Sequence, residues 1–278
     1  MGTVIVALDK FKGSIDAAHA TAALARGLLR SRPELVVRHC PVADGGDGTL
    51  DALVAAGFRR VSVTADGPTG RPVSTSYVAR GDVAVVELAD VSGLGRLPRG
   101  QPSADTALTA STLGTGRVVA AALDAGHRTV VIGLGGSAST DGGAGLVAAL
   151  GGRLLDAAGH ELPAGAEALA RLDRVDLDRL HPRLRPGADR VELVVACDVD
   201  NPLLGRGGAA AVYGPQKGAT RSRSSSWTPR SAAGPTGWKP RPASAPRTYP
   251  ARARRAEPVS PRSPSGPGCA AASSSCWA

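Results

Sequence analysis

Short apolar runs alternate with amphipathic stretches through the first 220 residues of this 278-residue chain. Each run is four to six residues long, rich in Val and Ile or bounded by turn residues, which is typical of buried β-strands. The predicted strands are Val4–Leu8, Leu35–Arg38, Arg60–Thr64, Val73–Val78, Val83–Leu88, Thr129–Ile132 and Val191–Ala196. Apolar residues at three- and four-residue spacing predict helices from an N-cap at Ser14 to Pro33, and over Leu50–Ala56, Thr112–Ala125 and Ala144–Leu150.

Alternation of strands and helices predicts an α/β fold with a parallel sheet. The first strand, helix and second strand form a βαβ opening, because parallel strands need a crossover connection between them. The β-rich stretch from Arg60 to Leu88 interrupts this rhythm and suggests a second lobe. The sequence shows no internal repeat.

The composition of the chain changes abruptly at Arg221. Residues 221–278 contain no Leu, Ile, Met or Phe, but twelve Ser and ten Pro. Nine Arg and one Lys stand there against one acidic residue, Glu257, so the net charge of +9 belongs wholly to this segment. Such a segment cannot bury enough apolar surface to offset its ordering entropy, and we expect it to be disordered. The charge therefore says nothing about the partners of residues 1–220.

The chain has no obvious membrane segment or metal-binding cysteine pattern. No apolar run approaches the length of a transmembrane helix, and no basic segment precedes the run Val4–Leu8 as in a signal peptide. The four Cys form no Cys-x-x-Cys pair and the five His are scattered, which argues against a structural zinc site. We expect a soluble, cytoplasmic protein of open oligomeric state.

The segment Gly133–Gly143 is the strongest candidate for chemistry. It follows the apolar run Thr129–Ile132 and precedes the predicted helix Ala144–Leu150. A glycine-rich turn between a strand and a helix binds phosphate through free backbone N–H groups, and here Ser and Thr hydroxyls add donors. Asp141 adds a carboxylate that could hold a metal. The alternative is a loop that only turns the chain tightly.

Asp-bearing glycine turns recur at the ends of predicted strands. They are Asp9–Gly13, Ala43–Thr49, Gly133–Gly143 and Cys197–Asn201. In an open parallel sheet such ends converge on one crevice where ligands bind. Phosphoryl transfer needs this set of groups: backbone donors for phosphates, carboxylates for Mg²⁺, a base and cations. The chain lacks the Gly-x-x-x-x-Gly-Lys-Ser/Thr loop of P-loop NTPases and the Gly-x-Gly-x-x-Gly of dinucleotide dehydrogenases.

An ordered set of motifs resembles the bacterial glycerate kinases of type 1 over about residues 1–220. The set is Asp9–Gly13 (DKFKG), Ala43–Thr49 (ADGGDGT), Gly67–Val73 (GPTGRPV), Leu113–Gly116 (LGTG), Gly133–Gly143 (GLGGSASTDGG), Ala196–Leu203 (ACDVDNPL) and Gly214–Gly218 (GPQKG). The resemblance implies ATP- and Mg²⁺-dependent phosphorylation of D-glycerate, generally to 2-phosphoglycerate. It also implies a parallel-sheet Rossmann-like lobe and a second α/β lobe, with the active site between them.

The resemblance implies catalytic roles for Asp44, Asp141, Asp198 and Lys12. Asp44 and Asp198 would bind Mg²⁺ or accept the proton of the glycerate hydroxyl, and Asp141 competes for either role. The alternative for Asp44 is capping of its turn. Lys12 would neutralise charge on phosphate or on the substrate carboxylate, the alternative being a solvated surface charge.

The resemblance also implies binding residues. Gly135, Gly136 and Ser137 would cradle the ATP phosphates. Lys217 would neutralise phosphate or carboxylate charge, and Arg71 could pair with the substrate carboxylate through two parallel hydrogen bonds. A solvated surface charge is again the alternative for each cation.

The chain departs from the family after Thr220. The family's chains continue into a helix and a further glycine-rich segment, whereas this chain enters its Arg/Ser/Pro-rich segment directly. A codon choice for Ser222–Ala243 exists whose neighbouring frame encodes an amphipathic helix. We therefore hypothesise that a frameshift replaced the true C-terminal part, leaving exposed apolar surface and little activity. Smaller departures are Lys10, where the family often has Ser, and Asp47, where Glu is usual.

Two other functions remain open from the sequence. One is a catalytically dead module that binds ATP or glycerate without turnover. The other, which we do not favour, is nucleic-acid binding through residues 221–278, whose arginines and interleaved tryptophans suit electrostatic contact and base stacking.

Overall fold

The computed structural model describes residues 2–11, 14–40, 42, 45–98, 101–187, 189–197, 199–203, 205 and 207–219. Lys12, Asp44 and Asp198 lie outside the described residues, and so does the whole segment 221–278 for which disorder and nucleic-acid binding were considered. Within the described part the strands form a five-stranded sheet and two two-stranded sheets.

The N-terminal βαβ unit is present as predicted. Strands β1 (Thr3–Val6) and β2 (Val36–His39) pair in parallel, and helix α1 (Ala17–Ser31) connects them. The helix begins later than predicted, because Asp16 rather than Ser14 is its N-cap and accepts a hydrogen bond from the backbone N–H of His19 at 2.8 Å. Ser14 is instead held in a tight turn in which its N–H donates to the carbonyl of Phe11.

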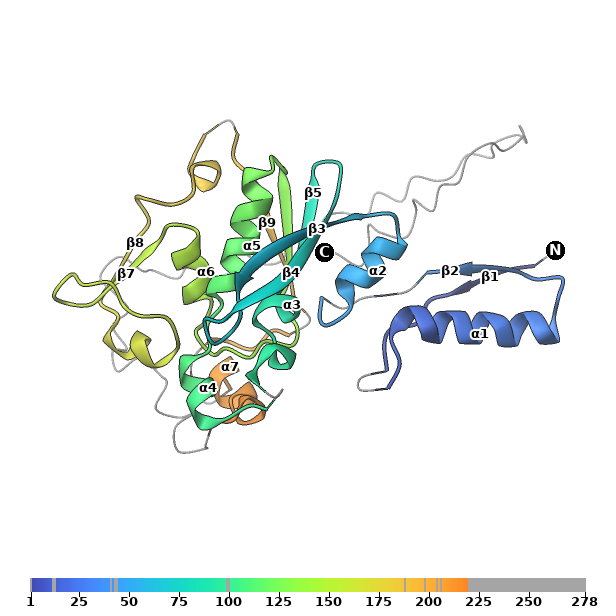
Figure 1. Cartoon of the computed structure of the whole chain (residues 1–278), viewed down its shortest axis with the longest axis horizontal. Helices are drawn as coiled ribbons and strands as arrows, with labels where there is room; N and C mark the ends of the chain where they lie inside the picture. Colours follow the sequence, from blue (N-terminus) through green and yellow to red (C-terminus); the bar gives the residue numbers. More distant parts are fainter. Residues whose placement is uncertain are drawn as a thin grey trace. The chain divides into compact units, whose positions relative to one another are not determined.

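The five-stranded sheet has the order β3-β4-β5-β6-β9 (Figure 1). Its strands are β3 (Arg59–Asp66), β4 (Pro72–Arg80), β5 (Val83–Glu87), β6 (Thr129–Gly133) and β9 (Glu192–Ala196). The first three are antiparallel, whereas β5, β6 and β9 run parallel. The stretch Arg60–Leu88, which suggested a second lobe, forms β3, β4 and β5 of this sheet, and β5 joins it to the parallel strands through β6.

Helices cover the two faces of this sheet around β5. Ala84 and Val86 of β5 pack in one cluster with Val118 and Leu123 of α5 (Leu113–Asp124). Val85 points to the other face and packs with Leu50 of α2 (Thr49–Ala55). A strand buried on both faces has a continuous apolar sequence, which explains the run Val-Ala-Val-Val at 83–86.

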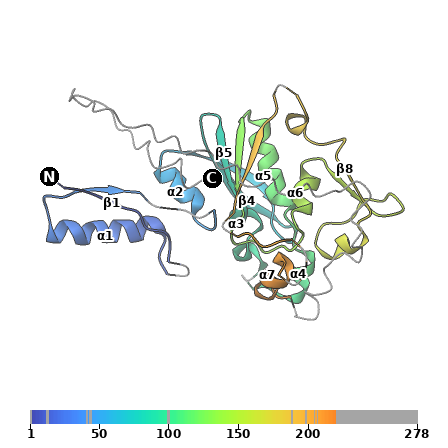
Figure 2. The same cartoon turned by 180° about the vertical axis from the view of Figure 1, so that it is seen from behind.

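The remaining elements are short. They are α3 (Leu88–Ser92), α4 (Ala104–Thr109), α6 (Ala144–Ala149), α7 (Ala209–Tyr213) and the antiparallel pair β7 (Arg153–Leu155) and β8 (Arg174–Asp176). The predictions for α2, α5 and α6 are confirmed within a residue or two. Figure 2 shows α7 next to α4, and the 3-10 turn Pro215–Lys217 that follows α7 also contacts α4.

Large apolar side chains are exposed on the outer strands of the described part. Ile5 of β1 is 66 % exposed and Val195 of β9 is 56 % exposed. None of the helices in the described ranges has the length and apolar character needed to cross a membrane.

Candidate active site

The parallel strands β5, β6 and β9 end side by side. Glu87 at the end of β5 pairs with Gly133 at the end of β6, and Gly133 pairs with Ala196 at the end of β9. The carboxyl ends of parallel strands form the edge of an open sheet at which ligands bind. The loops that leave these three strands therefore define the candidate site.

Two glycine-rich turns touch each other through their backbones at this edge. The N–H of Gly135 donates to the carbonyl of Gly45 at 3.3 Å, and a Cβ on Gly135 would lie 2.5 Å from the Cα of Gly46. A Cβ on Gly133 would lie 2.4 Å from the carbonyl oxygen of Gly45. Only glycine permits this approach. The structure thus brings the turns after residue 44 and after β6 together, as the sequence predicted.

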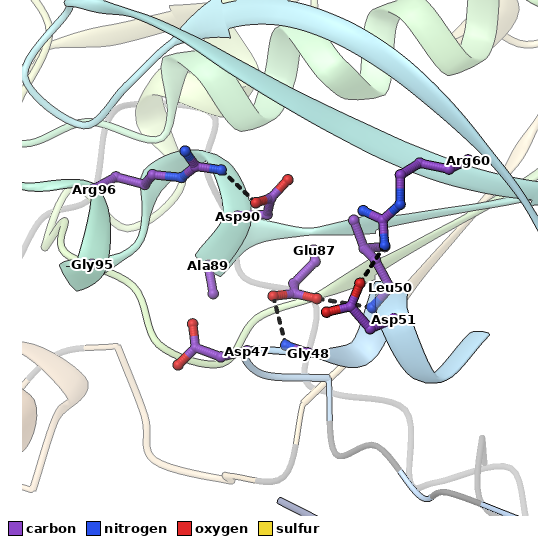
Figure 3. A pocket seen from close by; sticks show the side chains of 10 residues that line it. All are labelled: Asp47, Gly48, Leu50, Asp51, Arg60, Glu87, Ala89, Asp90, Gly95 and Arg96. Atoms are coloured by element: carbon purple, nitrogen blue, oxygen red, sulfur yellow. Dashed lines mark hydrogen bonds and ion pairs between the residues drawn. The ribbon is translucent and has the colours of Figure 1, made fainter. Parts of the chain in front are cut away.

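Glu87 secures the first of these turns to the sheet. The N-cap of α2 is Gly48, which has φ 87° and no side chain to cap the helix. Glu87 supplies the missing acceptor: Oε1 accepts from Gly48 N at 3.1 Å and Oε2 from Leu50 N at 3.0 Å (Figure 3). Burial raises the pKa of this carboxyl to about 7, and the two backbone hydrogen bonds act in the opposite direction.

A cavity of about 370 Å³ opens beside Glu87. Its lining residues are Asp47, Gly48, Leu50, Asp51, Arg60, Glu87, Ala89, Asp90, Gly95 and Arg96. Figure 3 shows Glu87 between two ion pairs, Arg96 with Asp90 and Arg60 with Asp51, each with an N–O distance of 2.5 Å. Asp51 and Asp90 are thus held in ion pairs with arginines, whereas Asp47 is an exposed carboxylate at the cavity.

The sequence pattern alone did not lead us to this cavity. Glu87 stands at the end of the apolar run Val83–Leu88, and we assigned that run only to a strand. The signal was available, because an acid directly after four apolar residues in a buried strand must find a buried partner or a functional role.

Asp141, a candidate metal ligand or base from the sequence, is buried and heavily hydrogen-bonded. It is 1 % exposed, and its Oδ2 accepts from Ser111 Oγ, Thr112 N, Thr112 Oγ1 and Gly145 N at 2.8–3.2 Å. Oδ1 accepts from Gly143 N at 3.3 Å. The carboxylate therefore serves as the cap of α6, and this geometry favours a structural role.

Lys217 lies against the glycine-rich turn after β6. Its Nζ donates to Ser137 Oγ at 2.6 Å and to the carbonyl of Ser139 at 2.5 Å. Burial lowers the pKa of this ammonium to about 8, whereas the nearby Asp141 carboxylate raises it. The ammonium is thus mostly charged at neutral pH. The Lys217 ammonium and the Ser137 hydroxyl therefore lie side by side. Gly136, which precedes Ser137, is exposed and has φ 71°.

Arg71 lies in the turn between β3 and β4, where its carbonyl accepts from Gly67 N at 2.7 Å. The Arg71 side chain is exposed and does not line the cavity. This turn contacts the Asp141 region, because Ser111 N donates to the carbonyl of Pro68 at 2.9 Å.

No metal site is formed by the residues that the structure describes. Among them there is no group of three or more His, Cys, Asp or Glu side chains that could hold an ion. The expected Mg²⁺ ligands Asp44 and Asp198 lie outside the described ranges, although Gly45 and Cys197, their chain neighbours, lie at the carboxyl edge of the sheet or directly after it.

Comparisons with known proteins agree on one family. The model of the "Glycerate kinase family" matches residues 4–228. A glycerate kinase of Bacillus subtilis is 47 % identical over 220 residues, and a glycerate 2-kinase of Escherichia coli is 41 % identical over 224 residues. A crystal structure described as that of a glycerate kinase 2 from Salmonella typhimurium LT2 is 40 % identical, with a TM-score of 0.70.

The matches cover most of this chain but only part of each relative. They span 78 % of this chain and 56 % of the Bacillus subtilis protein, and 79 % and 56 % for the Escherichia coli protein. The Salmonella structure is covered to 60 %, by 81 % of this chain. The chain thus spans little more than half the length of the relatives it matches.

Proposed function

Because the chain belongs to the glycerate kinase family, we propose that it transfers the terminal phosphoryl group of ATP to a hydroxyl of D-glycerate, giving ADP and 2-phosphoglycerate. The observation that supports this most directly is the contact between the two glycine-rich turns at the carboxyl edge of β5, β6 and β9, with the Ser137–Lys217 pair beside it. Phosphoryl transfer depends on positioning and charge stabilisation, which such an edge can provide.

The phosphate end of ATP would bind at the turn after β6. The exposed backbone of Gly136, the Ser137 hydroxyl and the Lys217 ammonium offer the donors and the positive charge that a polyphosphate needs. Gly135, the third glycine-turn residue expected to bind phosphate, would contribute by its lack of a side chain, which lets Gly46 approach the same turn. Bound ATP supplies the phosphoryl group, while Ser137 and Lys217 orient it.

The proposed base is a carboxylate that takes the proton of the attacking glycerate hydroxyl. Asp44 and Asp198 remain the candidates, because Asp141 already accepts five hydrogen bonds in the interior. The resemblance also assigns Mg²⁺ to Asp44 and Asp198, which are oxygen ligands of the kind this ion prefers. Lys12 and Arg71 stay candidates for the substrate carboxylate. The cytoplasmic location expected from the sequence stays a prediction.

The test is a turnover assay with the full chain. ADP release and formation of 2-phosphoglycerate, identified by NMR, are expected with ATP, Mg²⁺ and D-glycerate. Lys217→Met should lower kcat/KM by about 100-fold or more, because it removes the cation at the phosphate site. Arg32→Met removes one exposed positive charge elsewhere and should have no effect. Wild-type protein that is folded but releases no ADP would contradict the proposal.

A binding protein without turnover is the second candidate function. It is favoured by the coverage of 56 % of the curated relatives, since groups needed for turnover can lie in the part that does not match. Calorimetry would then show binding of ATP or D-glycerate while no ADP is released. Re-sequencing the gene through the codons around Gly218–Arg223 tests whether the proposed frameshift arose in the reading of the gene, and an unchanged sequence would refute that origin.

A further inference from the structure

The helix that follows the first glycine-rich turn depends on a distant residue for its N-terminus. Gly48, its N-cap, contributes no side chain, and the Thr49 hydroxyl is engaged with the carbonyl of Gly46 at 2.7 Å. The first N–H groups of a helix need acceptors, and those of Gly48 and Leu50 find theirs on Glu87, at the end of β5. The position of the turn is therefore tied to one carboxylate.

The same turn also fixes the second glycine-rich turn. Gly45 and Gly46 lie in backbone contact with Gly133 and Gly135, so that neither turn can shift without the other. Asp47 projects from the first turn toward Gly136: a Cβ on Gly136 would lie 3.3 Å from Asp47 Oδ1. A displacement at Gly48 would thus reach the proposed phosphate site.

We propose that Glu87 is a positioning residue for phosphoryl transfer, whose ionised carboxylate holds the turn Gly45–Gly48 against the carboxyl edge of the sheet. This inference rests on the proposed function for its kinetic consequence only. Both carboxylate oxygens accept an N–H when Glu87 is ionised. When Glu87 is protonated, one oxygen carries a proton and becomes a poor acceptor, so that one of the two amides loses its partner.

The surroundings of Glu87 place this change near neutral pH. Burial disfavours its charged form, and Asp47 of the turn and Asp90 of α3 add like charge. Asp90 is balanced by Arg96, and Asp51 of α2 is balanced by Arg60 of β3. The raised pKa of about 7 follows from these contacts. Glu87 is therefore expected to hold the turn fully above this pH and partly below it.

The first test observes the turn directly and needs no turnover. The amide proton resonances of Gly48 and Leu50 should shift together with pH in the wild-type protein, with a midpoint near pH 7. The same amides should not titrate in Glu87→Gln, whose amide cannot ionise. Wild-type amides that stay constant between pH 6 and 8, or that titrate equally in Glu87→Gln, would overturn the proposal.

The second test measures the kinetic consequence. Wild-type kcat/KM should rise as pH passes 7, and Glu87→Gln should be at least tenfold lower at pH 8 with this rise removed. Glu161→Gln makes the same chemical change at an exposed ion pair with Arg153 and should match the wild type. Wild-type kinetics in Glu87→Gln would overturn the positioning role.

The two tests separate the failure of this inference from the failure of the proposed function. If no variant shows turnover but the amides titrate as expected, the kinase activity is rejected, while the role of Glu87 in positioning the turn is supported. Normal turnover without the amide titration would reject the role of Glu87 and keep the kinase activity.

Discussion

The two glycine-rich turns of the candidate site are built in the same way. Each leads into a short helix through a left-handed glycine, Gly48 with φ 87° before α2 and Gly143 with φ 84° before α6. Neither glycine offers a side-chain cap, and in both turns a carboxylate accepts from the first backbone N–H groups of the helix.

The carboxylates differ in how completely they are satisfied. Asp141 comes from its own turn and accepts five hydrogen bonds, including two from hydroxyl groups. Glu87 comes from a strand 39 residues away from Gly48, accepts from two amides and borders a cavity. Burial with only two donors is the condition that raises the pKa of Glu87.

The largest effect is expected for Asp141→Ala. The change leaves the donors of Ser111, Thr112 and Gly145 buried without their acceptor, and each such group costs roughly 1–3 kcal/mol. We expect the free energy of unfolding, measured with urea, to fall by at least about 3 kcal/mol. Asp141→Asn keeps one acceptor oxygen and should lose less. Full stability of Asp141→Ala combined with lost turnover would instead identify Asp141 as a reacting group.

Ionisation of Glu87 should make the free energy of unfolding depend on pH. Its pKa is raised from 4.5 to about 7 in the folded protein, so the folded state binds this proton more tightly than the unfolded state does. The resulting stabilisation is complete below about pH 4.5 and is lost as pH rises through about 7, a change of about 3 kcal/mol.

The difference in unfolding free energy between the wild type and Glu87→Gln isolates this contribution from those of other groups. The unfolding free energy of the wild type minus that of Glu87→Gln should fall as pH rises from 4.5 to 7, because only the wild type has a carboxyl that ionises at this position. A difference that is constant over this range would show that Glu87 does not titrate as the structure indicates.

The contact between the turns can be tested with Gly135→Ala. The new Cβ would lie 2.5 Å from the Cα of Gly46, so the turns must separate. Overpacking of this kind costs about 1–3 kcal/mol, and we expect turnover to fall more than tenfold because both turns move. Gly187→Ala is the control, since nothing lies within 4 Å of its Cβ. Unchanged turnover in Gly135→Ala would show that the contact is not needed.

Local signals were sufficient to predict most elements of the described part. The apolar runs and helical spacing located β1, α1, β2, α2, β3, β4, β5, α5, β6, α6 and β9, but not the short helices α3 and α4. The glycines marked the edge where ligands would bind. The position of β5 in the sheet was not predictable in this way, because pairing of β5 with both β4 and β6 is a long-range choice.

The candidate site shows the same limit. The motif around Asp141 was easy to notice because its glycines are adjacent in sequence, but sequence does not show that Ser111 and Thr112 saturate the carboxylate. Glu87 was overlooked because its partners, Gly48 and Leu50, are 39 and 37 residues away. Both carboxylates have hydrogen-bond donors that come from distant segments, and the sequence alone does not show them.

The smallest effect is expected for Thr49→Val. This variant tests whether a hydrogen bond within the first glycine-rich turn also stabilises that turn. The change removes the bond from the buried Thr49 hydroxyl to the carbonyl of Gly46, while Thr49 N still donates to that carbonyl at 3.2 Å. We expect a loss of about 1 kcal/mol in unfolding free energy. Thr49→Ser keeps the hydroxyl and is the matched control. The amides of Gly48 and Leu50 should still titrate near pH 7 in Thr49→Val, because their acceptor is Glu87. Loss of that titration would assign the hold on the turn to the Thr49 hydroxyl.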